Sequence, residues 1–327
     1  MTQLSTHRRT ALIFGVNGQD GSYLAERLLE TGWHVIGIGR QDKARLDANL
    51  QGLQYHNSDI ADTEELIGLM EREEPTVIYY TAATHGAAGY DYEAVWKQNH
   101  IVNTLGLNAV LEYGRMASLK PTIFYFGSAK MFGALDGLII SESTPARSEC
   151  LYSISKNAGA ALVRYYRDTH AVPASVIWLF NHDSVRRKEG YFVPKIVSAL
   201  RAAKSDNTKR MELHSLDFWA DIGHSQEYMN ILVDHHLALK GQDIVMATGH
   251  TLWMRSCVNQ VFQRHGLNAD DHFDILVPAK SGHQGPPPWR ADIEKLNRLI
   301  GNTPQIFGSD LFDKIMKDSV NELSEKN

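Results

Sequence analysis

A short apolar run that opens into a glycine-rich turn and then a helix constrains the fold of this chain more than any other stretch. Residues 11–14 read ALIF, residues 15–21 read GVNGQDG, and residues 22–32 read SYLAERLLETG. Leucines recur on one face of the helical part, and Gly32 is a typical stop signal. This order of strand, tight turn and amphipathic helix predicts the first unit of a parallel sheet.

The turn also predicts a ligand. Gly15, Gly18 and Gly21 have a spacing that permits a tight turn, a close backbone approach to a pyrophosphate, and close packing of helix on strand. Three glycines alone are weak evidence, and the alternative is a turn with no ligand. The position between strand and helix is the context that favours dinucleotide binding. We therefore assign the following residues to a cofactor: Gly15, Gly18, Gln19, Asp20 and Gly21.

Strands and helices then alternate along the first half of the chain. Further strands are predicted at 34–39, 53–58, 76–83, 122–128 and 174–184. Helices are predicted at about 64–73, over a long stretch after Tyr92, and from Tyr152 to about Thr169. This rhythm predicts an α/β fold with a doubly wound parallel Rossmann sheet. We expect residues 1–184 to form the cofactor-binding domain and residues 185–327 a smaller substrate-binding lobe that exchanges segments with it.

Residues that follow the predicted strands indicate which dinucleotide is bound. Arg40 ends the second strand, where an acidic residue suits NAD and an arginine suits the 2′-phosphate of NADP. The alternative for Arg40 is a solvated loop cation. Asp59 and Ile60 follow the third strand at a place suited to the adenine, and Ala82 follows the fourth. We expect NADP, with NAD the less favoured cofactor.

A tyrosine and a lysine at helical spacing are the candidate chemical groups. Tyr152 and Lys156 are four residues apart and so share one helical face. A nearby ammonium favours the phenolate, which makes Tyr152 a plausible base for a sugar hydroxyl. The pair alone also occurs on solvated helices. Ser128, at the carboxyl end of a predicted strand, lies where such folds place chemistry.

Composition argues against several classes of protein. The formal net charge is -5, with no basic stripe that would bind nucleic acid. No apolar run approaches the ~18 residues of a membrane span. The N-terminal stretch leads into a strand, not into a signal-peptide core. Cys150 and Cys257 form neither a disulfide framework nor a C-x-x-C site, and we expect no metal. The sequence predicts a soluble cytoplasmic protein.

By its motifs the chain resembles the extended short-chain dehydrogenases/reductases that act on nucleotide sugars, and among them the GDP-mannose 4,6-dehydratases. The motifs that carry this resemblance are GVNGQDGSYLAERLLETG, YSISK, FNHDSVRR, DIGHSQEY, ATG at 247–249 and the D-x-x-K…LIGNTP run. The resemblance implies that Tyr152 and Lys156 form the redox pair and that Ser128 hydrogen-bonds the sugar oxygen that is oxidised. The residues that it implies for the GDP-sugar are His85, Asn181, Arg186, Lys195 and Asp221.

The chain also departs from that family. Lys130 stands where the family has a glutamate two residues after the active-site hydroxyl, and that carboxyl group serves as base and acid in the elimination of water. We count Lys130 with Ser128, Tyr152 and Lys156 as candidate catalytic residues. Ala220 replaces an arginine, and PPPWRAD stands where the family has another segment. The loop at 40–52 is shorter than the family's tetramer-forming loop, so we expect a homodimer.

Three functions follow from these observations. The first is an NADP-linked oxidoreductase acting at C4 of a GDP-linked hexose or heptose, as a 4-ketoreductase, 4-dehydrogenase or 4-epimerase. The second is a true 4,6-dehydratase whose acid/base lies elsewhere, at Glu142 or His85. The third is a sensor that binds NADP without turnover, against which the retained Ser128, Tyr152 and Lys156 argue.

Overall fold

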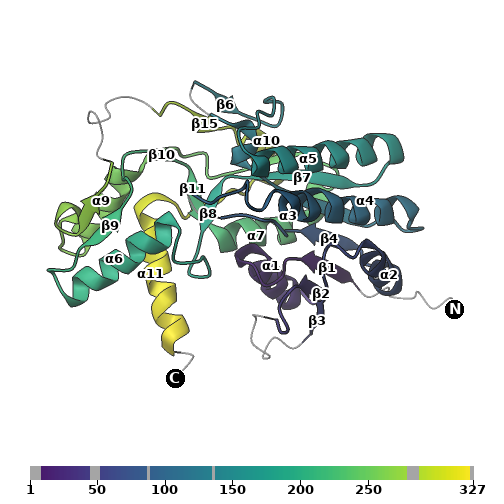
Figure 1. Ribbon diagram of the computed structural model, residues 1–327, viewed down its shortest axis with the longest axis horizontal. Helices are drawn as coiled ribbons and strands as arrows, with labels where there is room; N and C mark the ends of the chain where they lie inside the picture. The colour runs from purple at the N-terminus through teal and green to yellow at the C-terminus, as the bar shows by residue number, and fades with distance from the viewer. Residues whose placement is uncertain (1–8, 45–51, 87–88, 135–136, 278–286, 325–327) are drawn as a thin grey trace. The chain divides into compact units, whose positions relative to one another are not determined.

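The computed structural model describes residues 9–44, 52–86, 89–134, 137–277 and 287–324 (Figure 1). Parts of three stretches discussed above lie outside these residues: the N-terminal segment, the loop at 40–52, and the proline-rich segment at 286–292.

The chain forms two compact units and passes between them more than once. The first unit contains residues 1–133, 145–179 and 229–244, and the second contains residues 134–144, 180–228 and 245–327. The boundary expected after residue 184 therefore falls inside the second unit. Residues 134–144 belong to the second unit although the chain on both sides of them belongs to the first. Residues 229–244 belong to the first unit although the chain on both sides of them belongs to the second.

A seven-stranded sheet has the order β12-β7-β5-β4-β1-β2-β3, and all of its strands except β12, of which only Ile244 is included, lie within the first unit. Its strands are β1 (Thr10–Phe14), β2 (His34–Gly39), β3 (Leu53–Asn57), β4 (Val77–Tyr80), β5 (Thr122–Ser128), β7 (Ala174–Leu179) and β12 (Ile244–Met246). All pairs from β3 to β7 run parallel. The order reverses between β1 and β4, which confirms the predicted doubly wound sheet and places its switch point there.

Helices cover both faces of the sheet, which is why β1, β4 and β7 are apolar and buried along their whole length. The helices of this part of the chain are α1 (Gln19–Glu30), α2 (Thr63–Glu73), α3 (Trp96–His100), α4 (Gly106–Met116), α5 (Leu151–His170), α7 (Ser225–Asp234) and α8 (His236–Leu239). Helices α2, α4 and α5 lie side by side on one face, while α1 and α7 lie on the other (Figure 1). The Arg27 guanidinium of α1 binds the Asp234 carboxylate of α7, with Nε to Oδ1 at 2.9 Å.

Local signals explain where these helices begin and end. The Asp62 carboxylate accepts the Glu65 N–H at 3.0 Å and caps α2, as an N-cap aspartate does. Helix α1 ends before Gly32, whose φ of +80° is left-handed. The predicted helices over 64–73 and from Tyr152 to Thr169 thus match α2 and α5 to within a residue or so.

The long helical stretch predicted after Tyr92 is interrupted. A π-helical turn, η1 (Ile101–Leu105), separates α3 from α4, and the Gly106 N–H donates to the Ile101 carbonyl five residues earlier. The Tyr80 hydroxyl of β4 donates to the Val102 carbonyl at 2.5 Å and so takes an acceptor from the helical ladder. A strand side chain therefore accounts for the change of helical pitch.

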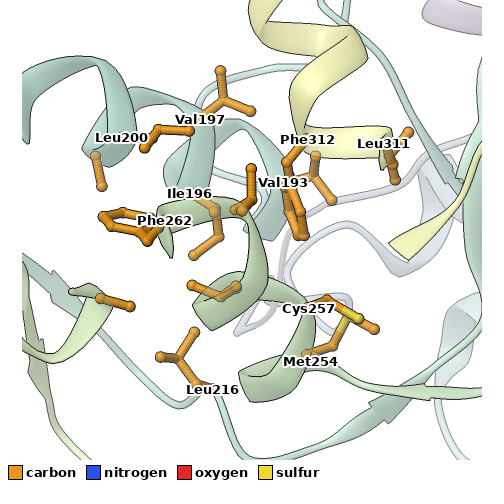
Figure 2. Packing of buried hydrophobic residues seen from close by; sticks show 14 of the residues in the cluster. Val193, Ile196, Val197, Leu200, Leu216, Met254, Cys257, Phe262, Leu311 and Phe312 are labelled. Atoms are coloured by element: carbon orange, nitrogen blue, oxygen red, sulfur yellow. The ribbon is translucent and has the colours of Figure 1, made fainter. Parts of the chain in front are cut away.

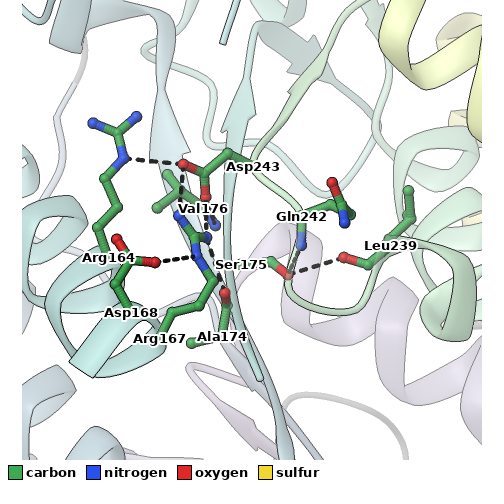
Figure 3. Close-up of polar contacts among 9 residues, drawn as sticks. All are labelled: Arg164, Arg167, Asp168, Ala174, Ser175, Val176, Leu239, Gln242 and Asp243. Atoms are coloured by element: carbon green, nitrogen blue, oxygen red, sulfur yellow. Dashed lines mark hydrogen bonds and ion pairs between the residues drawn. The ribbon is translucent and has the colours of Figure 1, made fainter. Parts of the chain in front are cut away.

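A bidentate ion pair fastens α5 to the sheet edge (Figure 3). Arg167 Nη1 lies 2.6 Å from Asp243 Oδ1, and Arg164 Nε lies 3.0 Å from Asp243 Oδ2. The same carboxylate accepts the backbone N–H of Val176 in β7 at 3.2 Å. Burial alone would raise the pKa of Asp243, but Arg167 and Arg164 outweigh it and hold that pKa below its usual value.

The second unit has its own apolar core, shown in Figure 2. Its helices are α6 (Phe192–Ser205), α9 (Met254–Arg264), α10 (Glu294–Ile300) and α11 (Gly308–Ser324). Its short strands are β6 (Ile139–Ile140), β8 (Asn181–Asp183), β9 (Met211–Leu213), β10 (Trp219–Ala220), β11 (Ile222–His224), β13 (Leu252–Trp253), β14 (Phe273–Ile275) and β15 (Arg290–Ala291). Ile196 of α6, Phe262 of α9 and Phe312 of α11 belong to this core.

Among the described residues, no helix combines the length and the apolarity that a membrane span requires.

Candidate active site

The glycine loop lies at the switch point of the sheet, against the residues that follow β4. Gly15 has a φ of +86°, and a Cβ there would lie 2.8 Å from Thr81 Oγ1 and 3.0 Å from the Ala82 nitrogen. A Cβ on Gly21 would lie 2.3 Å from the Gly15 carbonyl oxygen. These two positions therefore exclude side chains. Gly18 is different, because a Cβ there would meet only the Gly15 oxygen, at 3.2 Å.

Helix α1 begins in this loop without a side-chain cap. Gly18 is its N-cap in an extended conformation, and Asp20 lies in the first turn. The Gln19 side-chain amide donates to Asp20 Oδ1 at 3.2 Å. A helix N-terminus with no capping side chain over it has the geometry that an anionic diphosphate requires.

A polar cluster joins the glycine loop to the residues after β2. The Asn17 amide donates to Gln41 Oε1 at 2.9 Å and to the Tyr55 hydroxyl at 3.2 Å. The Tyr55 hydroxyl donates to the Gln41 carbonyl at 2.6 Å. Arg40, beside this cluster in sequence, is exposed. This role of Asn17 and Tyr55 was not predictable from the sequence, because their connection spans two loops.

The residues assigned to the adenine follow β3. Asp59 is exposed, and its Oδ1 accepts the Ala61 N–H at 3.0 Å. Ile60 is buried and packs close to Gly106, where a Cβ would lie 2.1 Å from Ile60 Cγ2. Gly106 of α4, which has no side chain, therefore leaves room for Ile60 at this edge of the sheet.

Ser128 and Lys130 occupy the turn after β5. Ser128 caps the 3₁₀ turn η2 (Ala129–Phe132), and its Oγ accepts the Lys130 N–H at 3.2 Å. The Asn157 amide of α5 donates to the Met131 carbonyl at 3.1 Å. The turn that carries Ser128 and Lys130 is thus held against the helix that carries Tyr152.

Tyr152 and Lys156 are both buried on α5, as their spacing predicts for one face. Lys156 Nζ donates to the Phe126 carbonyl of β5 at 2.7 Å and lies 4.7 Å from the ring centroid of Tyr125. Burial lowers the pKa of the Lys156 ammonium to about 7, and the negative charge of Asp20 opposes this shift.

Aromatic rings enclose Tyr152, which is 4% exposed. Its ring stacks on that of Tyr92 with centroids 5.5 Å apart, and the edge contact with His85 has centroids 5.1 Å apart. Lys130 Nζ lies 5.9 Å from the Tyr92 centroid. The structure therefore brings His85, Lys130 and Tyr152 into one cluster in the first unit. Tyr92 was not among the predicted site residues, and the closely spaced pair Tyr90 and Tyr92 was the only signal for it in the sequence.

The remaining residues assigned to the substrate belong to the second unit. Asn181 is exposed in β8, Arg186 is half-buried after it, and Lys195 is half-buried in α6. The predicted substrate role of these three stays a prediction.

Asp221 is different because it is completely buried. Its Oδ1 accepts from Thr248 N at 3.1 Å, and its Oδ2 accepts from Gly249 N at 2.9 Å. Burial raises the pKa of Asp221 to about 6, although these hydrogen bonds oppose the shift. The contacts of this carboxylate are internal and hold the turn at 247–249.

Glu142, considered above as an acid/base, lies in the second unit. One of its carboxylate oxygens accepts the Val245 N–H at 2.9 Å. Within the described residues, no three His, Cys, Asp or Glu side chains are grouped so that they could hold a metal ion.

Comparison with known proteins identifies the family. The profile of the family described as GDP-mannose 4,6 dehydratase matches residues 12–285. GDP-mannose 4,6 dehydratase 2 of Caenorhabditis elegans is 30% identical over 273 residues, which cover 79% of this chain and 71% of that protein. GDP-mannose 4,6-dehydratase of Sinorhizobium fredii is 30% identical over 282 residues, 81% of this chain and 79% of that protein.

Solved structures share the fold at lower identity. The dTDP-glucose 4,6-dehydratase of Streptomyces venezuelae, determined with NAD, has a TM-score of 0.79 at 17% identity, covering 97% of this chain and 98% of that one. UDP-glucose 4-epimerase of Brucella ovis, in complex with NAD, has a TM-score of 0.77 at 16% identity, covering 95% and 98%. Their likeness supports the Rossmann fold, and the profile match together with the two relatives shows that the chain belongs to the GDP-mannose 4,6-dehydratase family.

Proposed function

We propose that this protein is an NADP-linked oxidoreductase that transfers a hydride at C4 of a GDP-linked hexose or heptose. It acts as a 4-ketoreductase, a 4-dehydrogenase or a 4-epimerase. The observation that carries this proposal is the pairing of buried Tyr152 and Lys156 on α5 with a turn in which an ammonium, Lys130, follows Ser128. The groups for hydride chemistry are present, whereas the residue two positions after Ser128 is not a carboxylic acid.

The chain's residues fit a nicotinamide dinucleotide, which when bound accepts or donates the hydride. Gly15, Gly18 and Gly21 with the uncapped start of α1 would hold its diphosphate. Asp59 and Ile60 would face the adenine. Further contacts are assigned to Gln19, Asp20, Ala82, Tyr152 and Lys156.

Tyr152 would move the proton of the sugar hydroxyl. A cationic Lys156 stabilises the phenolate, and the Ser128 hydroxyl orients the C4 oxygen by hydrogen bonding. Burial, opposed by the charge of Asp20, brings the pKa of Lys156 to about 7, so an anionic cofactor beside it would favour its charged form. Asn181, Arg186 and Lys195 would bind the substrate's diphosphate and nucleotide.

A 4,6-dehydratase is the second candidate, and the position of His85 favours it. Its ring lies 5.1 Å from that of Tyr152, whereas Glu142 has a backbone partner in the second unit. His85 is therefore the better replacement for the missing carboxyl group. A sensor without turnover has no use for the Tyr152 and Lys156 arrangement.

A panel of GDP-sugars assayed with the wild-type enzyme separates these candidates. We expect net change at the nicotinamide absorbance, or inversion at C4 with unchanged product mass. Loss of water from GDP-mannose at ordinary enzyme rates would show that the enzyme is a 4,6-dehydratase. It would also show that Lys130 does not prevent the elimination of water. No reaction with any sugar, while NADP binds, would support the sensor.

The cofactor preference gives a first prediction. Arg40 is an exposed cation at the end of β2, so it can meet a 2′-phosphate, and NADP should bind the nucleotide-free protein about ten-fold or more tightly than NAD. Calorimetry with both cofactors measures the ratio. Arg40→Ala should remove most of the preference, while equal affinities in the wild type would contradict the NADP proposal.

We also infer a homodimer. Trp96 of α3, Leu105 of η1 and Ile154 of α5 are exposed on elements that pack against one another. A group of exposed apolar side chains on adjoining helices suits an isologous interface between two copies.

A further inference from the structure

Lys130 has a fixed place beside the proposed reaction centre. Its backbone N–H donates to Ser128 Oγ at 3.2 Å, and its turn is tied to α5 through Asn157 and the Met131 carbonyl at 3.1 Å. The backbone of Lys130 is therefore fixed relative to Ser128 and to the helix that carries Tyr152.

Lys130 is exposed, and its side chain reaches an aromatic ring. Lys130 Nζ lies 5.9 Å from the ring centroid of Tyr92, at the outer limit of ~6 Å for a cation–π contact. Tyr92 in turn stacks on Tyr152. A carboxylate attracts an ammonium more strongly than a ring face does, so the exposed Lys130 side chain can bind a ligand that carries this group.

The other lysine of this cluster is not suited to bind a substrate anion. Lys156 is 1% exposed, and its Nζ already donates to the Phe126 carbonyl at 2.7 Å. Lys130 is thus the better candidate of the two for contact with an incoming negative group.

We propose that Lys130 is a specificity-determining residue that selects a nucleotide sugar with a carboxylate at C6. This inference rests on the proposed function, in which Ser128 and Tyr152 bind the C4 oxygen. A side chain two residues from Ser128 then reaches substituents on the ring carbons next to C4. In a hexose, C6 on the neighbouring C5 is the carbon there that can be a carboxylate. The preferred substrates are therefore nucleotide-linked uronic acids.

The test compares neutral and acidic sugars as matched pairs. GDP-mannose is paired with GDP-mannuronate, and UDP-glucose with UDP-glucuronate, in both turnover and calorimetric binding to the NADP-loaded enzyme. The measured quantity is the ratio of acidic to neutral sugar in kcat/KM and in affinity. Lys130→Gln should lower this ratio by roughly 10- to 100-fold, as loss of a charge-assisted hydrogen bond predicts. Lys130→Arg should keep it.

A matched control removes the same charge elsewhere. Lys240 is an exposed lysine of the first unit, at the end of α8, and Lys240→Gln should leave the ratio unchanged. An unchanged ratio in Lys130→Gln, or a wild type that favours the neutral sugar, would overturn the inference. If the acidic sugar binds in a Lys130-dependent way but no hydride is transferred, the proposed function fails and the inference stands. Binding of neither pair overturns both.

Discussion

Tyr152 can be tested at its hydroxyl alone, because its ring is held by its neighbours. Tyr152→Phe keeps the stack on Tyr92 and the edge contact with His85, so the fold and NADP affinity should not change. Removing the group that moves the proton should lower turnover by about 100- to 10,000-fold. Single-turnover absorbance measures the step, with calorimetry as the binding control. Turnover above a few per cent of wild type would mean that another group takes the proton.

The buried ammonium of Lys156 should lower the stability of the fold, whereas the proposed hydride transfer requires it. Its pKa falls from 10.5 in an exposed chain to about 7 on burial. Between these pH values the unfolded chain holds a proton that the folded chain lacks, so stability of the nucleotide-free protein should rise with pH across this window. Lys156→Met fills the same space without the charge.

The variant should therefore unfold at a higher temperature than the wild type near pH 7, and the gap should narrow towards pH 10. It should also lose hydride transfer. Thermal unfolding at several pH values measures the gap, and a gap that does not depend on pH would contradict the assigned burial cost.

Sequence spacing predicted the local parts of the site better than the distant ones. Tyr152 and Lys156 are four residues apart, so helical geometry alone places them on one face. Tyr92 contacts Tyr152 from a segment far away in sequence, and no periodicity reports such a contact. For Asp221, the motif predicted a polar group at the substrate, while its contacts with Thr248 and Gly249 depend on a turn formed later in the chain.

At the scale of elements, the anchoring of α5 depends on Asp243. This carboxylate is 11% exposed and binds Arg164, Arg167 and the Val176 N–H together (Figure 3). Asp243→Asn removes the carboxylate that Arg164 and Arg167 share, and should lower the free energy of unfolding by roughly 2–4 kcal/mol. Urea unfolding measures the change.

Asp168 supplies the matched control for this prediction. It is 72% exposed and lies 3.5 Å from Arg167 Nε. Asp168→Asn should cost less than about 0.5 kcal/mol, since exposed pairs contribute little. Equal losses in the two variants would show that Asp243 has no special role in anchoring the helix.

Wild-type stability should also fall as pH drops through the lowered pKa of Asp243, since that carboxylate then gains a proton.

The order of strands and helices was predictable from the sequence, whereas the interruption of the helical stretch after Tyr92 was not. Apolar strands alternating with amphipathic helices predicted the parallel sheet and the positions of α2 and α5. The π turn at Ile101–Leu105 escaped prediction because its cause, the Tyr80 hydroxyl on the Val102 carbonyl, comes from β4. Helical periodicity carries no information about such a partner.

At the scale of the whole molecule, Trp96 tests the proposed dimer. Its side chain is 58% exposed on α3, so Trp96→Glu should place a charge in the interface and halve the mass measured by light scattering. Leu237 of α8 is also exposed, and Leu237→Glu should leave the mass unchanged. A wild-type protein that is monomeric at micromolar concentration would contradict the dimer.

The return of residues 229–244 to the first unit has a consequence for synthesis on the ribosome. Asp243 follows Arg167 by 76 residues and Arg164 by 79, and β12 adds the edge strand at the same point. At 5–20 residues per second the nascent α5 waits roughly 4–16 s for its counter-charge. During that interval the edge of β7 is open to pairing with other chains. Slow codons between residues 180 and 243 would lengthen this exposure, so aggregation during expression should depend on translation speed in that part of the gene.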